Sequence, residues 1–551
     1  MNLRGVSLPN PRIHRLAPDA GPPTSAFARA LRAREGDALE FLPPPPADEA
    51  AWRTVLEDVA SRARPLPEDV AAAIVERQVA LGSGARAVEA ARRLVRGEAV
   101  AIVTGQQPGL FGGPLLTAHK LAGAVHLARR LDALEGPPVV PVFWCASEDH
   151  DLDEANRLGV LDREGVTRLL RVEAAPDGRS LEHVDLAPGA LAEVHAALLE
   201  ALPDTPRAHA AVDPLQPAAA EGFVAHAMRS LLHVFGDAGI VVLDPFDLLP
   251  AAGPTLARLV RDGARIHDRI RETGTRLRAA GLPAPLDPEP GSLPLFVRDA
   301  DDGPRLRVGI EPDGQVSARG DVTAPDLETM AARVEANPRL ASGNVVGRVF
   351  VQNALLPVVA YIAGPTEIAY QAQVRAAALD LGLPFPLALP RPEATWVDRK
   401  TIDRLAAFGL DVGAALARGA DAGAPQRATD ERWSQAMAEH LATWPVSVID
   451  LVEGGGRAGE AMGRALDRLR STWEKAEASV RAGQAADAGM DGARYARAAE
   501  MLWPRGRGQD RFLSPWSFAA RHGLEALRAG LGALDPLVPG HVVFELDPAA
   551  P

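Results

Sequence analysis

AVAIVTGQQPGLFGGP, residues 99–114, is the stretch that decides the fold prediction. Its first five residues form a short apolar run, which favours a buried strand, and the glycines after it predict a turn. Pro114 suits the start of a helix because it lacks the backbone N–H that would be left unpaired there. After that helix comes a second apolar run, residues 139–144. Strand, helix and strand in this order predict a βαβ unit and therefore a parallel sheet.

The chain on both sides extends this pattern into an α/β protein. Residues 1–100 look largely helical, and residues 67–97 are expected to form a lead-in helix before the first strand. Additional strands are expected at residues 239–244, 349–352, 358–362 and 541–546. The stretches near 160–215 and 285–325 are expected to be inserted modules. The core is therefore expected to span residues 1–397.

Residues 398–500 contain no convincing strand and are expected to form a helical arm. Their apolar residues follow a heptad pattern, which is typical of coiled coils, at Met462, Leu466, Leu469, Trp473, Ala476 and Val480. Because this run is short, it favours a helical hairpin over a long free coiled coil. Residues 501–551 are expected to return to the core.

Composition and charge narrow the class of protein. A chain of 551 residues is long enough for two or three domains, and its net charge of -13 lacks the basic character of nucleic-acid-binding proteins. The single cysteine, Cys145, excludes an internal disulfide and is expected to be buried and inert within its apolar run. No leader-like N-terminus and no apolar stretch of about 18 residues is found, so we expect a cytoplasmic protein that does not cross a membrane.

The glycine-rich turn is the first candidate site. Glycines let a backbone approach a ligand closely, and N–H groups at the start of a helix favour anions. In the helix that follows, His119 and Lys120 can neutralise a phosphate or a carboxylate. The turn matches neither a Walker A loop nor the dinucleotide GxGxxG motif, so an ordinary glycine-rich turn remains an alternative. The candidate binding residues here are Thr104, Gly105, Gln106, Gln107, Gly109, Gly113, Thr117 and His119.

An acidic segment, EDHDLDE at residues 148–154, follows the second strand. Ligands of open α/β sheets bind at the carboxyl ends of strands, which is where this segment begins. Its carboxylates can hold Mg²⁺ beside a nucleotide or bind a substrate ammonium, and a histidine can act as a general base. A solvated loop that caps the next helix is the alternative. The candidate catalytic residues are His150, Lys120, Asp149 and Asp151, the binding candidates are Trp144 and Glu148, and no residue is assigned as a dedicated metal ligand.

Three further segments place polar residues beside predicted strands. One opens a helix with glycine and proline, and its side chains at spacing i, i+3 and i+6 share a face. A second precedes the apolar run at 349–352, and a third is a polar cluster near residues 503–516. Capped helices and surface turns are the alternatives. The candidate binding residues are Asn344, Arg348, Gly364, Pro365, Glu367, Tyr370, Gln373, Arg391, Gln509 and Arg511.

In this order, the blocks resemble the BshC family, the cysteine-adding enzymes of bacillithiol biosynthesis. The resemblance rests on TGQQPGLFGGPLLTAHKL (104–121), PVFWCASEDHDLDEAN (141–156), VVLDP (241–245), the block 344–374, LALPRPEAT (387–395) and QDR (509–511). The family implies a Rossmann-like core with connecting insertions and a helical coiled-coil arm that forms a homodimer. It also implies amide formation between cysteine and glucosaminyl-malate. Because an amide requires an activated carboxylate, ATP with Mg²⁺ is expected.

By position, the resemblance places phosphate or malate at the TGQQ loop, the amine or the metal at the acidic segment, and the GPTEIAY turn over the pocket. Asn353, Asp510 and Cys145 stand where the family usually carries aspartate, glutamate and an aliphatic residue. Two alternatives remain. One is a different ATP-dependent ligase for amino acids and amines on the same scaffold. The other is a non-catalytic nucleotide-binding protein that acts through its arm.

Overall fold

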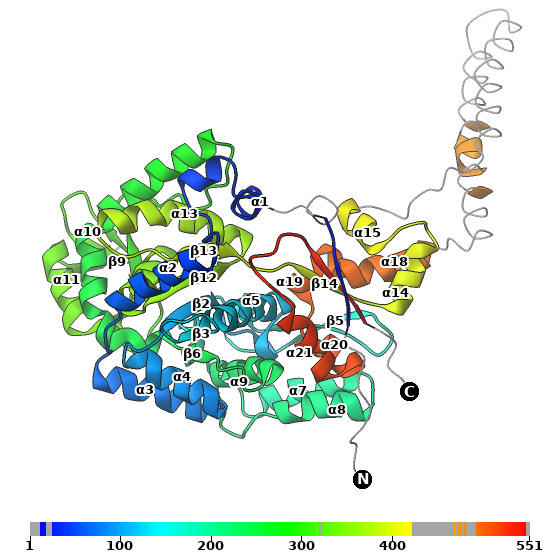
Figure 1. Ribbon diagram of the computed structural model, residues 1–551, viewed down its shortest axis with the longest axis horizontal. Coiled ribbons are helices and arrows are strands. Elements are labelled where there is room, and N and C mark those ends of the chain that lie inside the picture. The colour runs from blue at the N-terminus through cyan, green and yellow to red at the C-terminus, as the bar shows by residue number, and fades with distance from the viewer. Residues whose placement is uncertain are drawn as a thin grey trace, which may run out of the picture.

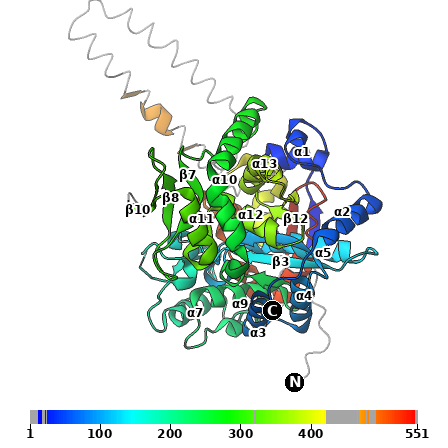
Figure 2. The ribbon, with the colours of Figure 1, turned by 90° about the vertical axis from the view of Figure 1, so that its left-hand side faces the viewer.

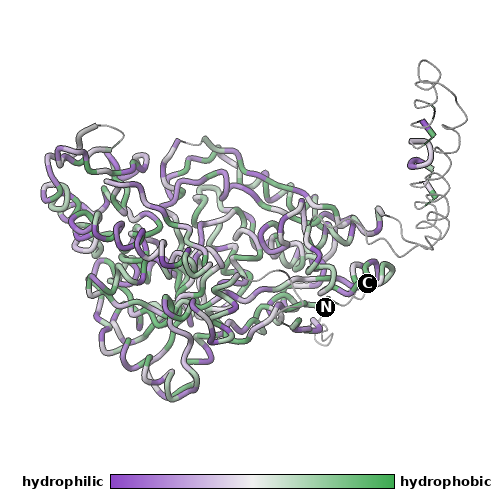
Figure 3. Tube along the Cα trace, turned by 90° about the horizontal axis from the view of Figure 1, so that it is seen from above, coloured by the Kyte–Doolittle hydropathy of each residue, from purple (hydrophilic) through white to green (hydrophobic). Residues whose placement is uncertain are grey.

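The computed structural model describes residues 11–17, 22, 25–175, 177–318, 321–420 and 492–546, with short helical pieces between 465 and 480. Figure 1 shows a body in which helices surround central strands. Along the outer helices the hydropathy changes repeatedly between hydrophilic and hydrophobic, as expected for helices with one buried face (Figure 3). Within the described residues, no helix combines the length and the apolar character that crossing a membrane requires.

A five-stranded parallel sheet, in the order β13-β12-β2-β3-β6, forms the centre of the body. Its strands are β2 (Val100–Gln106), β3 (Val139–Cys145), β6 (Val241–Leu243), β12 (Val358–Ala363) and β13 (Leu387–Pro390). The chain starts at β2, adds β3 and β6 on one side, and then adds β12 and β13 on the other. The strand order therefore reverses between β2 and β12, and Rossmann-like sheets bind ligands at the carboxyl ends beside such a reversal.

The side chains of β2 alternate between two apolar cores, which explains its continuous apolar sequence. Ala101 and Val103 belong to a core that also contains residues of α10 (Pro245–Ala279), α12 (Val345–Leu355) and α13 (Pro365–Asp380). Val100 and Ile102 belong to a core shared with α2 (Glu49–Arg62) and α5 (Leu115–Asp132). Figure 2 shows these helices around the sheet. The α/β class predicted from the sequence is confirmed.

Two groups of elements are inserted between strands of the parallel sheet. The first contains the hairpin of β4 (Arg157–Leu161) and β5 (Thr167–Arg171), then α7 (Ala190–Ala201) and α8 (Pro206–Val212), ahead of α9 (Phe223–Phe235). The second contains an antiparallel sheet in the order β10-β9-β8-β7-β11, packed beside α10 and α11 (Leu327–Ala336). Its strands are β7 (Ser292–Val297), β8 (Leu306–Ile310), β9 (Val316–Ala318), β10 (Asp321–Ala324) and β11 (Ala341–Gly343).

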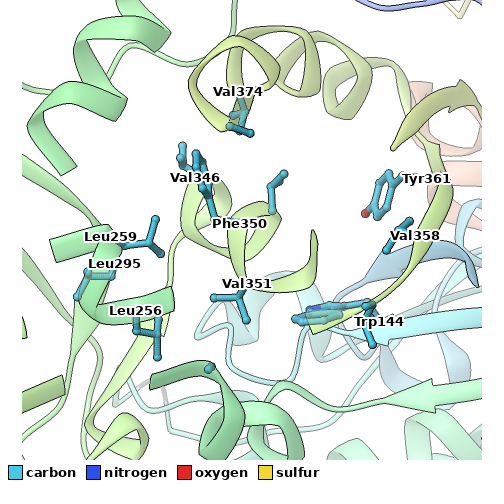
Figure 4. Close-up of a cluster of buried hydrophobic side chains, with 14 of the residues drawn as sticks. Trp144, Leu256, Leu259, Leu295, Val346, Phe350, Val351, Val358, Tyr361 and Val374 are labelled. Carbon is cyan, nitrogen blue, oxygen red and sulfur yellow. The ribbon is translucent and has the colours of Figure 1, made fainter. Parts of the chain in front are cut away.

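The strand predicted at residues 349–352 is wrong, because these residues lie inside α12. The side chain of Asn344 caps this helix by accepting from the backbone N–H groups of Val346 at 2.9 Å and Gly347 at 3.1 Å. Figure 4 shows Phe350 and Val351 of the helix among buried side chains from neighbouring elements. A short apolar run fits a buried helix as well as a buried strand, and here the N-cap and the packing select the helix.

The N-terminal region also departs from the prediction. Residues 67–97 form two helices, α3 (Glu68–Ala80) and α4 (Ala85–Val95), instead of one. They are separated at Gly82, whose φ of +68° is incompatible with a continuing right-handed helix. Farther upstream, β1 (Arg12–Arg15) is extended where a helix was expected, because it pairs antiparallel with β15 (Val542–Leu546).

The C-terminal strand predicted at 541–546 is present as β15, but it lies in a second sheet. This three-stranded sheet has the order β1-β15-β14, with β14 at Ala394–Asp398. The preceding helices α19 (Gln509–Phe512), α20 (Trp516–His522) and α21 (Leu524–Gly532) return to the core. The indole N–H of Trp516, for example, donates to the backbone carbonyl of Phe111 at 2.8 Å.

Both ends of the predicted arm pack on the body. Helices α14 (Arg399–Ala406), α15 (Val412–Arg418) and α18 (Gly492–Leu502) share an apolar cluster with β14 and β15. Phe408 and Tyr495 meet within it, with ring centroids 5.3 Å apart. The central part of the arm, including Met462 and Leu466 of the heptad pattern, lies outside the described residues.

Candidate active site

Lys120 and Glu367 join the two strands on either side of the point where the strand order reverses. Lys120 lies on α5, which follows β2, and its Nζ is 2.7 Å from Oε2 of Glu367 on α13, which follows β12. The same Nζ donates to the carbonyl of Gly105 and to Oε1 of Gln106, the latter at 3.1 Å. Lys120 therefore has three acceptors and holds the end of the TGQQ loop against the start of α13.

Burial and charge act in opposite directions on this pair. Burial lowers the pKa of Lys120 below its ordinary value, and Glu367 opposes that effect. For Glu367, burial alone would raise the pKa, but Lys120 and the N–H of Gly364, which donates to Oε2 at 2.7 Å, hold it below its ordinary value. Lys120 is thus a positioning group in the resting protein, fully used in internal bonds.

Two tyrosines and Arg348 extend this polar cluster. The hydroxyl of Tyr361 donates to Oε1 of Glu367 at 3.0 Å. Arg348, on α12, donates to the hydroxyls of Tyr361 at 3.3 Å and Tyr370 at 2.5 Å. The sequence predicted that Glu367, Tyr370 and Gln373 share one face of the helix. Glu367 and Tyr370 belong to this polar cluster. Gln373 instead binds the backbone of Leu286, donating to its carbonyl and accepting from its N–H, each at 2.8 Å.

The acidic segment lies against the TGQQ loop. Nε2 of Gln107 donates to Oδ2 of Asp149 at 2.6 Å, so two loops identified separately in the sequence meet. The carbonyl of Asp149 accepts from the N–H of Leu181 at 2.7 Å, which ties the loop to the first inserted module. Burial would raise the pKa of Asp149, but donors from His150 and Gln107 and the charge of Arg305 hold it well below its ordinary range. Asp149 is therefore an anion fixed by its partners.

The two other candidate catalytic residues of this segment lie farther out. His150 has 44% of its side chain exposed, and its Nδ1 is 3.5 Å from Oδ1 of Asp149. Asp151 is exposed and caps α6 (Leu152–Ala155) by accepting from the N–H of Glu154 at 3.0 Å. The helix-capping alternative therefore describes Asp151.

A cavity of about 740 Å³ opens between the acidic segment and the antiparallel sheet. Its volume is within the range of small-molecule sites. The second module supplies Phe296 and Arg305, whose guanidinium carbon lies 4.2 Å from the centroid of the Phe296 ring. Arg305 also donates to Oγ of Ser342 at 3.2 Å and to the carbonyl of Gly343 at 3.0 Å. Predicted residues that line this cavity are Glu148, Asp149, His150, Asn344 and Arg348.

Phe296, Arg298 and Arg305 were missed by the sequence reasoning. Arg298 is 1% exposed and Arg305 is 8% exposed, although arginines are rarely buried. Arg298 follows β7 and Arg305 precedes β8, close to the exposed Arg307, so the residue type alone did not predict which of these arginines is buried. Their contacts with residues such as Ser180 and Asp149 span more than a hundred positions.

Several predicted binding residues serve the interior of the protein. His119 is fully buried, and its Nε2 accepts from Nε1 of Trp396 at 3.1 Å. Burial lowers the pKa of His119 to about 3, so it is neutral and cannot balance a phosphate as expected. Thr104 donates to the carbonyl of Ile362 at 2.9 Å, and Trp144 is 1% exposed within the apolar core.

The start of α5 makes contacts within the protein. The N–H of Leu115 donates to the carbonyl of Leu513 at 2.8 Å, and Thr117 is buried. Gly109 and Gly113 approach each other so closely that a Cβ on Gly109 would lie 2.6 Å from Cα of Gly113. Glycine is needed there for packing of the turn, and binding of a phosphate at this turn stays a prediction.

Gln509 and Arg391 belong to a separate buried group beside β13 and β14. Gln509 accepts from the N–H of Trp396 and donates to the carbonyls of Trp396 and Met501, each at 2.8 Å. Arg391 pairs with Asp510 at 2.6 Å, and Arg511 is exposed. Gly364 and Pro365 begin α13 beside Glu367.

No preformed metal site exists among the described residues, since no three His, Cys, Asp or Glu side chains gather as a metal ion would require. Mg²⁺ in nucleotide-dependent enzymes is commonly held by one or two carboxylates together with phosphate oxygens. Asp149 is a carboxylate at the cavity whose pKa is lowered, but its oxygens already accept from Gln107 and His150.

Comparisons with known proteins agree with this fold. The sequence pattern of "Bacillithiol biosynthesis BshC, N-terminal Rossmann-like domain" matches residues 22–392, more than half of the chain. A relative from Koribacter versatilis, named "Putative cysteine ligase BshC", is 33% identical over 71% of this chain and 73% of its own length. Its namesake from Heliobacterium modesticaldum is 33% identical over 61% of this chain. That match spans 62% of the Heliobacterium protein, less than two thirds of its length. The chain therefore belongs to the BshC family of bacillithiol biosynthesis.

Proposed function

We propose that this protein is a ligase that joins the carboxyl group of cysteine to the amine of glucosaminyl-malate. The observation that carries the proposal is the 740 Å³ cavity, in which acidic and basic side chains meet at the carboxyl edge of a Rossmann-like sheet. The relatives are each named "Putative cysteine ligase BshC", and the cavity of this protein suits such a reaction.

The charges of the cavity suit an acceptor that carries both carboxylates and an amine. Arg305, Arg307 and Arg348 line one part of it, and guanidinium groups bind carboxylates through two parallel hydrogen bonds. Arg305 is the best placed of these, because Phe296 and Ser342 fix its plane. The carboxylates of Glu148 and Asp149 line the cavity as well and suit an ammonium group.

Activation of the cysteine carboxylate by ATP with Mg²⁺ stays a prediction. At the start of α5, where the sequence placed the phosphate, the N–H of Leu115 is already bonded to the carbonyl of Leu513. The arginines of the cavity are therefore the groups that we expect to bind an anionic leaving group. Homodimer formation through the arm likewise stays a prediction, which sedimentation of the full chain would test.

Mass-spectrometric product detection tests the proposed reaction. Purified protein is incubated with cysteine, glucosaminyl-malate, ATP and Mg²⁺, and each component is omitted in turn. We expect an amide product that carries the cysteine thiol and disappears without either substrate. If a panel of other amino acids and amines gives products and this pair does not, the protein is a different ligase. If no pair gives a product, the non-catalytic reading is favoured.

An Arg305→Lys variant tests the cavity itself. Lysine keeps the charge but loses the planar, paired geometry, so the KM for glucosaminyl-malate should rise about tenfold, equivalent to about 1.4 kcal/mol, with a smaller change in kcat. Arg163→Lys, at an exposed position, is the matched control. An unchanged KM in Arg305→Lys would show that glucosaminyl-malate does not bind beside Arg305 in this cavity.

A further inference from the structure

Glu148 is a buried carboxylate that lines the cavity without a partner. The residue is 7% exposed. Its neighbour Asp149 accepts several hydrogen bonds, and Ser147 donates to Asp244 at 2.6 Å. The carboxylate of Glu148, by contrast, forms no hydrogen bond or ion pair within the described part of the chain. Burying an unpaired carboxylate is costly, so a polar group from outside the protein is the natural partner.

Three arginines act on Glu148 by their charge, and each of them donates hydrogen bonds to other residues. Arg305 donates to Ser342 and Gly343, and Arg348 donates to Tyr361 and Tyr370. Arg298 donates to the carbonyl of Arg339 at 3.1 Å. These guanidinium groups therefore act on Glu148 by charge at a distance, and they leave its oxygens free to receive a proton.

Glu148 and Asp149 are adjacent carboxyl groups with opposite behaviour. Burial raises the pKa of Glu148 above its ordinary value, and the negative charge of Asp244 adds to this effect. Arg305, Arg298 and Arg348 oppose the rise without cancelling it. The pKa of Asp149 is lowered by its donors. Neighbouring acids whose environments separate their pKa values in this way commonly divide the roles of proton acceptor and fixed anion.

We propose that Glu148 is the general base that removes a proton from the acceptor amine, a role that rests on the proposed function. The carboxylate takes one proton from the acceptor ammonium, and the freed nitrogen lone pair forms the C–N bond with the carboxyl carbon of cysteine. That carbon must already carry a phosphate-type leaving group, whose C–O bond breaks and whose oxygen keeps the electron pair. The second proton lost by the nitrogen leaves with this group. The two carboxylates attract the ammonium group, and the nearby guanidinium groups then favour loss of its proton.

This assignment moves the base from His150 to Glu148. His150 is nearly half exposed and touches the edge of Phe296, with ring centroids 5.9 Å apart. Water reaches it freely, whereas Glu148 is shielded. A shielded carboxylate with raised proton affinity is the better proton acceptor close to neutral pH.

Kinetics of Glu148→Gln with two acceptors tests the assignment. Glutamine has the same shape but cannot accept the proton, so kcat with glucosaminyl-malate should fall by about 100-fold or more. Hydroxylamine is largely uncharged at neutral pH and needs no base, so with this acceptor the variant should lose far less. Glu148→Asp should retain part of the rate, because it keeps the carboxylate. Glu173→Gln, an exposed glutamate in the first inserted module, is the matched control and should behave as the wild type.

The outcomes separate the two proposals. An active wild type with an equally active Glu148→Gln variant overturns the role of Glu148 and leaves the proposed function intact. An equal loss with both acceptors also overturns it, because binding or structure would then explain the defect. If the wild type forms no amide with any cosubstrate, the proposed function fails and this role fails with it. Thermal unfolding of each variant verifies that it is folded. If Glu148→Gln is not folded, the two acceptors are compared with Glu148→Asp instead.

Discussion

Lys120 and Glu367 form a buried ion pair of 2.7 Å between the helices that follow β2 and β12. The side chain of Lys120 is 1% exposed and that of Glu367 is 20% exposed. Because the strand order of the sheet reverses between β2 and β12, this pair fixes the two edges of the crevice where Rossmann-like sheets bind ligands. The pair holds the starts of the two helices together at this crevice.

Loss of one member of this pair should destabilise the protein strongly. Lys120→Met leaves the Glu367 carboxylate buried without its cation, and such changes cost about 3–5 kcal/mol. Glu367→Gln should cost less in the Lys120→Met background than in the wild type, because its partner is already absent. Urea unfolding followed by tryptophan fluorescence measures both effects. Lys400→Met, at an exposed lysine, is the control, and strictly additive losses would contradict the coupling.

Gly105 lies beside the same pair, and any side chain at this position is expected to destabilise the protein. A Cβ at this position would lie 3.0 Å from the carbonyl of Trp144 and 3.3 Å from the hydroxyl of Tyr361. Gly105→Ala should therefore cost about 1–3 kcal/mol and displace Tyr361 from Glu367. Gly136→Ala, where a Cβ meets nothing within 4 Å, should leave the melting temperature unchanged. Equal melting temperatures for the two variants would show that the backbone of Trp144 can shift away from the added Cβ without loss of stability.

The sequence predicted the strands and loops whose pattern is local. The apolar runs at β2, β3 and β12 are buried on both faces, so their composition alone identifies them. Because the carboxyl ends of these strands share one edge, the meeting of Gln107 and Asp149 could also be anticipated. The run at 349–352 was misassigned because its helical state depends on the Asn344 cap and on packing.

The second wall of the cavity could not be predicted. Arg305 reaches the acidic segment only because the antiparallel sheet folds back over the edge of the parallel sheet. Nothing in its local sequence distinguishes it from the exposed Arg307. The same limit applies to Glu148, which stands in a row of carboxylates and is set apart from them by its burial.

Gln509 should prove to be a structural residue. Its amide makes three buried hydrogen bonds that tie α19 to β14 and α18. Gln509→Ala leaves those backbone groups unpaired, so we expect a loss of about 2–4 kcal/mol in unfolding free energy. The KM values for both substrates should remain within about twofold of the wild type. A raised KM with unchanged stability would instead show that Gln509 contributes to substrate binding, as the sequence predicted.

Acid should unfold the protein partly through its buried histidines. Burial lowers the pKa of His119 to about 3 and that of His541 to about 4, against about 6.5 in an unfolded chain. Between these values the unfolded chain binds the additional protons, so stability falls as the pH is lowered through about 6.5. The loss approaches about 1.4 kcal/mol per pH unit for each histidine. His119→Gln, whose carbonyl can still accept from Trp396, should remove one histidine's share of this slope in urea unfolding between about pH 7 and 5. His209 has its pKa raised by Asp204 and Asp213, so the folded state holds its proton and His209→Gln should not flatten the slope. An unchanged slope in His119→Gln would mean that His119 is protonated in the folded protein.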